Sequence, residues 1–284
     1  MTQVSMPNNS VLLRTSDVLF GASRCDLTDA ETEVEETEKH HTLVFPVEGV
    51  FSVDTGSNLT SATPSKVLFF RKGQTHRVLH PYGANDRSFY FSLSQRIIDP
   101  FIDAEGGFPP MSAFTQPSFD FRLIRLVNRA ARRELTRLEL DEFVLHTLTH
   151  STGESLAPSL HSNQHRQVAI DADEHLALHF QEDCDLAHVA SDVGVSPHHL
   201  SRVFKAVTGR SLTRRRTQLR LLHALEQIVS GADDLSMVAV EAGFYDHSHM
   251  ANSFRAHLGV SPSMARIGAV RPMDLPRTAA MSGA

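Results

Sequence analysis

The spacing of apolar and polar residues divides the chain into two halves of different character. In the first half, short runs of β-branched and aromatic residues alternate with stretches of Gly, Pro, Asn and Asp, which is typical of strands and turns. The runs predict strands at 41–47, 49–54, 66–73, 76–80 and 88–93. Several short strands at nearly regular spacing indicate a sandwich or a barrel.

The apolar residues then change to helical spacing. From Phe119 to about Thr149 they recur three and four positions apart, which predicts an amphipathic helical stretch. The segment 151–164 is rich in Ser, Gly and Pro and is expected to be a linker. The rest of the pattern is helical, and the predicted helices span 165–181, 185–193, 197–208, 212–230, 235–242 and 247–258, with a short one from 262.

Capping residues support these helix boundaries. Ser196 followed by Pro197 places a capping hydroxyl before a proline at the first helical position. Glycine occurs where three of the helices should end, at Gly209, Gly231 and Gly259. The tail after residue 267 has no periodic pattern and is expected to be loose.

The helical half contains an internal duplication. Three spacings occur twice: Ala190-x3-Gly194 and Ala239-x3-Gly243, Leu200-x3-Phe204 and Met250-x3-Phe254, and Phe204-x4-Gly209 and Phe254-x4-Gly259. In each unit, two helices would cross closely at an alanine and be joined by a turn in which glycine adopts a left-handed backbone at little cost. The duplication therefore predicts two helix-turn-helix units, joined by the helix at 212–230.

Polar residues on the second helix of each unit are the predicted DNA contacts. Side chains on this face can reach base edges in a major groove, and cations can reach phosphates. The predicted base-edge residues are His198, Ser201 and Arg202 in the first unit and His247, Ser248 and Asn252 in the second. The predicted contacts to the DNA backbone are Lys205, Arg214, Arg215, Arg216 and Arg255.

Composition narrows the class of protein. The chain has 284 residues and no apolar run near the roughly 20 residues of a membrane helix, and its start lacks the pattern of a secretory signal. Its 2 cysteines cannot make a disulfide framework or a cysteine-rich zinc site, so we expect a cytoplasmic protein. The net charge of −6 is not the usual footprint of nucleic-acid binding, but 198–225 carries Lys and Arg and no acid.

Two segments resemble a known DNA-binding domain, that of the AraC/XylS-type bacterial transcription regulators. They are DLAHVASDVGVSPHHLSRVFKAVTGRSL and AVEAGFYDHSHMANSFRAHLGVSPSMAR, and the most specific piece is GF-x4-H-M-x3-F-x4-G-V-S-P, from Gly243 to Pro262. The resemblance covers 165–267. It implies a monomeric domain with two helix-turn-helix units and base contacts from the six residues given above.

The chain departs from this family pattern at two positions and in charge. Arg215 stands where the family usually has an aromatic residue, which either costs packing or adds a phosphate contact. Asn252 stands where an Arg is common, and Asn prefers adenine whereas Arg prefers guanine. The domain is slightly acidic, so we expect its affinity to depend on a few well-placed phosphate contacts.

The first half is similar to the cupin-like sensor of the same family, on the patterns Glu48-Gly49 and Lys72-Gly73-Gln74-x-His76. Cupins often hold a metal through His and Glu, and the candidates here are His40, His41, Glu48, His76 and His80. Adjacent His40 and His41 would point to opposite faces of a strand, and the usual His-x-His pair is absent. We therefore expect no metal and no cofactor, and we assign His41, Glu48 and His76 to an effector pocket.

The predicted fold is α+β and multidomain. It comprises a cupin-like β-barrel sensor domain (1–115), a helical dimerisation region and linker (116–164), an all-α domain with two helix-turn-helix units (165–267) and a loose tail (268–284). Two points stay open. The apolar positions of the 119–149 stretch form a dimer seam or pack on the barrel, and the acidic run 26–38 is a solvated loop or an arm that touches Arg214–Arg216.

The predicted function is a sequence-specific transcription regulator and not an enzyme. It would be an activator whose first domain senses a small molecule, dimerises, or does both. The expected partners are double-stranded promoter DNA, RNA polymerase, a small-molecule effector and a second copy of the chain, with no membrane. The alternatives are a metal-dependent cupin enzyme with a helical appendage and a protein-interaction module.

Overall fold

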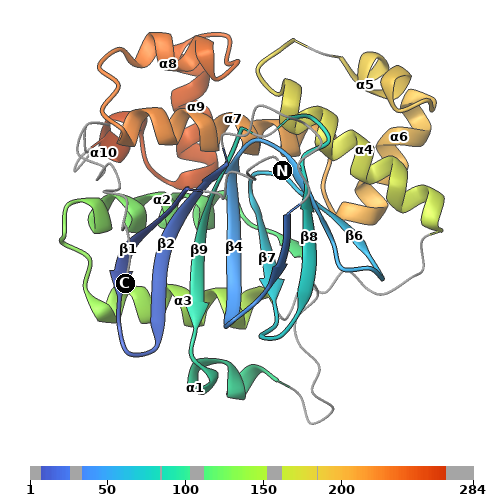
Figure 1. The fold of residues 1–284 in the computed structure, drawn as a ribbon. Coiled ribbons are helices and arrows are strands. Elements are labelled where there is room, and N and C mark those ends of the chain that lie inside the picture. The colour runs from blue at the N-terminus through green and yellow to red at the C-terminus, as the bar shows by residue number, and fades with distance from the viewer. Residues whose placement is uncertain are drawn as a thin grey trace, which may run out of the picture.

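The computed structural model describes residues 8–25, 34–83, 85–102, 112–151, 162–183 and 185–266. The predicted loose tail, most of the linker at 151–164 and most of the acidic run at 26–38 lie outside the described residues. Two sheets, a pair of helices beside them and a group of helices beyond the strand ends make up the molecule (Figure 1). None of the described helices is long and apolar enough to cross a membrane.

The described residues of the first half form ten strands in two antiparallel sheets. The six-stranded sheet has the order β1 (Asn8–Arg14), β2 (Val18–Cys25), β9 (Asp86–Leu93), β4 (His41–Glu48), β7 (Lys66–Phe70) and β10 (Ser112–Phe114). The four-stranded sheet has the order β3 (Val34–Thr37), β8 (Thr75–Leu79), β5 (Phe51–Asp54) and β6 (Leu59–Ala62). The five predicted strands are confirmed, and β1, β2, β3, β6 and β10 are additional.

The expectation of a barrel is wrong in one respect, because the described sheets do not close on each other. β1 and β10 are the edges of the larger sheet, and β3 and β6 are the edges of the smaller one. One face of the larger sheet packs on the smaller sheet, through Leu68 and Phe70 against Phe51 and Val53. Because the two sheets face each other across a shared apolar layer, the domain is a sandwich with open edges.

The other face of the larger sheet is covered by α2 (Pro117–Ala131) and α3 (Arg137–Ser151), which cross behind the strands (Figure 1). Phe119 of α2 and Phe143 of α3 stack on Phe45 and Phe91 of the sheet. The predicted stretch at 119–149 is thus two helices, with a break at Arg133, which has a left-handed φ of 60°. The short α1 (Gln95–Ile98) and the 3-10 helix η1 (Asp99–Phe101) follow β9.

Packing decides between the two interpretations of the α2 apolar positions. Leu123, Leu126 and Ala130 are buried within the single chain, and Val127 packs against the same core. α2 contacts α7 (Leu212–Val229) and α9 (His247–Leu258) as well as α3. These positions therefore pack inside the monomer and are not available as a dimer seam.

The second half is all-α, as predicted, and its helix boundaries lie close to the expected ones. The remaining helices are α4 (Asn163–His179), α5 (Leu186–Asp192), α6 (Pro197–Thr208), α8 (Leu235–Glu241) and α10 (Pro262–Arg266). The Ser196 hydroxyl accepts a hydrogen bond from the His199 amide at 3.3 Å and caps α6. Gly209 and Gly259 end α6 and α9 in the left-handed conformation, each with φ 71°.

The two helix-turn-helix units are α5–α6 and α8–α9, and they lie at opposite ends of α7 (Figure 1). Both turns contain a glycine with positive φ, 74° at Gly194 and 81° at Gly243. At Gly243 the reason is also steric, because a Cβ there would lie 2.5 Å from the carbonyl oxygen of Gln181. The duplication seen in the sequence is therefore a duplication of structure.

Candidate nucleic-acid interface and effector cavity

The outer face of α6 carries the predicted contacts of the first unit. The apolar residues Leu200, Val203 and Phe204 are buried, which turns the opposite face of the helix to solvent. The residues left exposed on that face are His198, Ser201, Arg202 and Lys205. Because they recur three and four positions apart, they form one stripe that a major groove can accept.

The outer face of α9 carries the contacts of the second unit. Met250, Ala251 and Phe254 are buried. His247, Ser248, Asn252 and Arg255 are exposed. On this stripe the Arg255 Nη1 donates a hydrogen bond to the Asn252 Oδ1 at 3.1 Å, so the amide is oriented by its neighbour.

The three consecutive arginines at the start of α7 have different surroundings. Arg214 is exposed, and Arg216 is half-buried in a groove with Ser201 of α6. Arg215 is fully buried. Successive helical residues point about 100° apart, so the middle arginine shares the inward face with Gln218 and Leu222, three and seven positions on. The prediction that Arg215 contacts the DNA backbone is therefore wrong.

Arg215 instead joins the helical domain to the sandwich. Its Nε donates to the Asp173 Oδ1 of α4 at 2.6 Å, and its Nη2 donates to the Thr63 hydroxyl at 3.1 Å and to the Pro64 carbonyl at 2.8 Å. Lys66 of β7 pairs with the other carboxylate oxygen of Asp173 at 2.8 Å. We call Thr63, Lys66, Asp173 and Arg215 the Asp173 cluster.

The charges of the Asp173 cluster are compensated away from water. Burial raises the pKa of Asp173, but the adjacent Arg215 and Lys66 outweigh it and hold the pKa well below its usual range. The ring of Phe114 lies under both cations, with its centroid 4.9 Å from the Lys66 Nζ and 5.1 Å from the Arg215 Cζ. Breaking such a buried group is strongly destabilising, because a charge is left without its partner.

A second buried polar group lies one turn further along α7. The Gln218 amide donates to the Asp120 carboxylate of α2 at 2.8 Å and to the Thr115 carbonyl at 2.9 Å. Arg210 donates to the same Thr115 carbonyl at 2.8 Å. Burial raises the pKa of Asp120, and hydrogen bonds from Thr115 and Gln218 partly oppose it.

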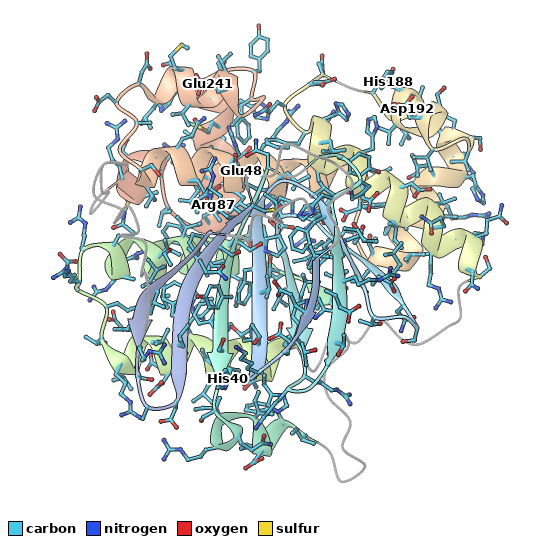
Figure 2. All side chains as sticks on the ribbon, viewed as in Figure 1. His40, Glu48, Arg87, His188, Asp192 and Glu241 are labelled. Carbon is cyan, nitrogen blue, oxygen red and sulfur yellow. The ribbon has the colours of Figure 1, made fainter. Side chains whose placement is uncertain are left out.

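Arg87 of β9 makes a third connection between the domains. It pairs with Glu226 of α7 at 2.7 Å and with Glu48 at 3.3 Å, and Figure 2 shows Glu48 and Arg87 together at the end of the strands nearest the helical domain. Burial raises the pKa of Glu226, and the Arg87 charge partly opposes it. α7 is thus attached to the first half of the chain at three points along its length.

A cavity of about 260 Å³ lies between the two sheets. Its apolar wall includes Val44, Phe51 and Phe70. Its polar wall includes Glu38, His76, His80, Ser88 and Tyr90. Burial lowers the pKa of His76 and raises that of Glu38. A cavity with an apolar wall and a few buried polar groups is the usual form of a small-molecule site.

Only one of the three residues predicted to line the effector pocket lines this cavity. His76 does. His41 lies on the other face of β4, where its Nε2 is 3.3 Å from the Gln95 Oε1, and the cavity is lined by the next residue, Thr42. Glu48 is exposed beside Arg87. The assignment of His41 and Glu48 to the effector pocket is therefore wrong. The alternation of side chains along β4 and the bulge near Pro46 direct both side chains away from the cavity.

Three residues at one end of the cavity, Cys25, His80 and Asp86, are absent from the predicted effector pocket. Cys25 ends β2 and faces Asp86 across the β2–β9 pairing, while His80 follows β8 of the opposite sheet. The strand signal of VLFGAS was present in the sequence, but nothing along the chain shows which residue faces Cys25. The register of strands distant in sequence is decided by packing.

A family model described as a helix-turn-helix domain matches residues 189–267. The chain is 28% identical to the arabinose operon regulatory protein of Escherichia coli (strain K12), over 72% of this chain and 73% of that protein. It is 22% identical to the HTH-type transcriptional regulator ExsA of Pseudomonas aeruginosa, over 78% of this chain and 84% of that one. The chain belongs to the AraC/XylS family of transcription regulators.

Among solved structures, this regulator has a distant likeness to wild-type ToxT from Vibrio cholerae bound to an unsaturated fatty acid. That likeness covers 90% of this chain and 96% of the other, with 11% identity and a TM-score of 0.38. The matched family model includes both α6 and α9, the helices with the exposed polar stripes. The regulator binds DNA through this domain, and the family does not consist of enzymes. The cupin-enzyme alternative is thereby set aside.

Proposed function

We propose that the regulator reads a promoter through α6 and α9 together, with base contacts from the six predicted residues. The observation that supports this most is the pair of exposed polar stripes, one on each second helix, attached to the same long α7. Lys205 and Arg255, which belong to the stripes, and Arg214 and Arg216, at the start of α7, are assigned to phosphates. Two recognition helices on one body suit two boxes about one helical turn apart, roughly 34 Å along the duplex.

The first domain, in this proposal, senses a small molecule in the cavity between the sheets. The cavity is close in size to the smallest ligand sites, which suits a compact polar molecule. His76, Tyr90 and Ser88 would orient it by hydrogen bonds. The Asp173 cluster and the Arg87–Glu226 pair would transmit its effect, because they connect the sandwich to the helix that carries both units.

A second copy of the chain is proposed to bind on the outer face of α3. Leu138 and Leu145 are 69% and 43% exposed there, seven residues apart on one side of the helix. The buried α2 positions are not available for this role. We further propose activation through RNA polymerase, from a position in the cytoplasm, because both are usual for regulators of this type.

The test is selection of bound sequences from a random duplex pool, using the full chain. We expect a bipartite site with two boxes about one helical turn apart. Enrichment of a single box would remove α9 from base reading, and no enrichment with or without cell extract as a source of effector would overturn the proposal. Arg202→Ala and Asn252→Ala variants should each lose selectivity within one box only.

A further inference from the structure

Cys25, His80 and Asp86 converge at one end of the cavity. One donor atom from each, the thiol sulfur, an imidazole nitrogen and a carboxylate oxygen, lies within 4.8 Å of the other two. All three residues are buried. We propose that these residues bind a divalent metal ion of the zinc class. The inference rests on the cavity proposed above as the effector site, and it names the chemistry of one end of that cavity.

The donor set favours zinc over a hard cation. Thiolate and imidazole are ligands of zinc and its neighbours, whereas calcium and magnesium take oxygen ligands. Ligands at 2.0–2.3 Å around a tetrahedral zinc lie about 3.3–3.8 Å apart. The spacing of the three donor atoms therefore needs only small side-chain movements to reach that geometry.

Strand register holds the three ligands in place. Cys25 and Asp86 are direct partners in the β2–β9 pairing, so their side chains leave the same face of the larger sheet. His80 directly follows β8 of the smaller sheet, and its Nε2 is 3.0 Å from the Asp86 Oδ2. A site built across two sheets in this way would tie them together when the metal is bound.

Buried polar atoms around the cluster point to a missing ligand. Among the residues that the structure describes, no hydrogen-bond partner is found for the His80 Nδ1, the His76 Nδ1 or the Ser88 Oγ. All three side chains line the cavity and are buried. A buried polar atom without a partner is costly, so a hydrated metal or an effector would satisfy groups that the protein alone leaves unsatisfied.

Three protein ligands leave one tetrahedral position open. In zinc sites with three protein ligands, the fourth position is held by water or by a bound molecule. Because all three ligands line the cavity, a molecule bound in the cavity would be able to reach that position. An effector that carries a thiol, amine or carboxylate would bind the metal directly, and the rest of the molecule would occupy the space beside Phe51 and Phe70.

The chain offers a second set of donors for comparison. His175, His188 and Asp192 also lie within 4.8 Å of one another, between α4 and α5. This set is largely exposed, with His188 and Asp192 on α5 (Figure 2), and it contains no sulfur. A spectrum that reports a thiolate ligand therefore distinguishes the two sets.

The experiment is a titration of the reduced, metal-stripped full chain with Co²⁺, without DNA, followed by displacement with Zn²⁺. We expect a thiolate-to-cobalt charge-transfer band that saturates at about one equivalent. Cys25→Ser should abolish the band, and His80→Gln and Asp86→Asn should weaken Co²⁺ binding at least tenfold. The matched controls Cys184→Ser and His175→Gln, the latter in the second donor set, should keep both the band and the affinity.

Two results would overturn the inference: absence of the band, or a band lost in Cys184→Ser and kept in Cys25→Ser. Circular dichroism checks that each variant folds. If Cys25→Ser does not fold, Zn²⁺ should protect Cys25 selectively from alkylation in the unaltered chain, and equal modification with and without Zn²⁺ would contradict the site. Because the titration contains no DNA, a negative cobalt result does not contradict the proposed promoter binding. In the same way, a negative promoter selection does not contradict the metal site.

Discussion

The two helix-turn-helix units have nearly the same local structure but different surroundings. Each begins with an aspartate cap, has a glycine turn and ends at a left-handed glycine. The first unit packs on α4, whose Asp173 is part of the polar cluster shared with the sandwich. The second packs on α2, α7 and α10 through the apolar core around Met250 and Phe254.

The surfaces of the units differ as well. α6 presents Arg202 and Lys205, whereas α9 presents Asn252 already hydrogen-bonded to Arg255. The duplicated sequence keeps its fold in both units because caps and turns depend on nearby residues. Its role can diverge, because the neighbours of each copy are supplied by distant parts of the chain.

The largest expected effect on stability follows removal of the Asp173 carboxylate, which lies at the centre of the Asp173 cluster. Asp173→Ala should lower the free energy of unfolding by about 3–5 kcal/mol, since Arg215 and Lys66 would stay buried without an anion. Denaturant unfolding of the full chain measures this. Asp171→Ala, on the same helix but outside the cluster, is the control, and equal losses from both variants would contradict the argument.

Base reading should differ between the two units. Arg202→Ala should cost about 1–3 kcal/mol of specific binding if the guanidinium contacts a guanine. Asn252→Ala should cost less, because the amide already has one protein partner. Fluorescence anisotropy on the selected site and on random DNA measures both. A loss of equal size on random DNA would assign Arg202 to phosphates instead.

The neighbouring arginines of α7 should separate DNA binding from domain attachment. Arg214→Ala should weaken binding to all sequences and lower the salt slope by about 1, as expected for one phosphate contact. Arg215→Met should leave the salt slope unchanged and alter the free energy of unfolding. A change of salt slope in Arg215→Met, with none in Arg214→Ala, would contradict these roles and make Arg215 the phosphate contact.

The smallest expected effect concerns pH. Burial lowers the pKa of His223, which lies on α7 between the units and near the Gln181 and Gln227 side chains. As pH falls through about 6.5, His223 is protonated in the unfolded chain before it is protonated in the folded chain. The free energy of unfolding therefore decreases over this range. His223→Gln should reduce the dependence of the unfolding free energy on pH between 7 and 5. An unchanged dependence would show that His223 does not contribute.

Much of the helical domain could be predicted because its signals are local. Periodicity placed the helices, and Ser196 and Gly209 marked the ends of α6. The exposed stripes followed from the same periodicity. The position of Arg215 also had a signal, because it lies in helical register with Leu219 and Leu222. Three arginines in a row obscured that signal.

The sequence by itself determined the class of each half, the helix ends, the duplicated units and their outward faces, because these depend on residues at most a few turns apart. Tertiary structure alone decided which strands pair, that the sheets stay open, that Arg215 is buried against Asp173 and that Cys25 faces Asp86. Contacts of that kind join residues far apart in the chain, and their register is selected by packing of the whole domain rather than by any local preference.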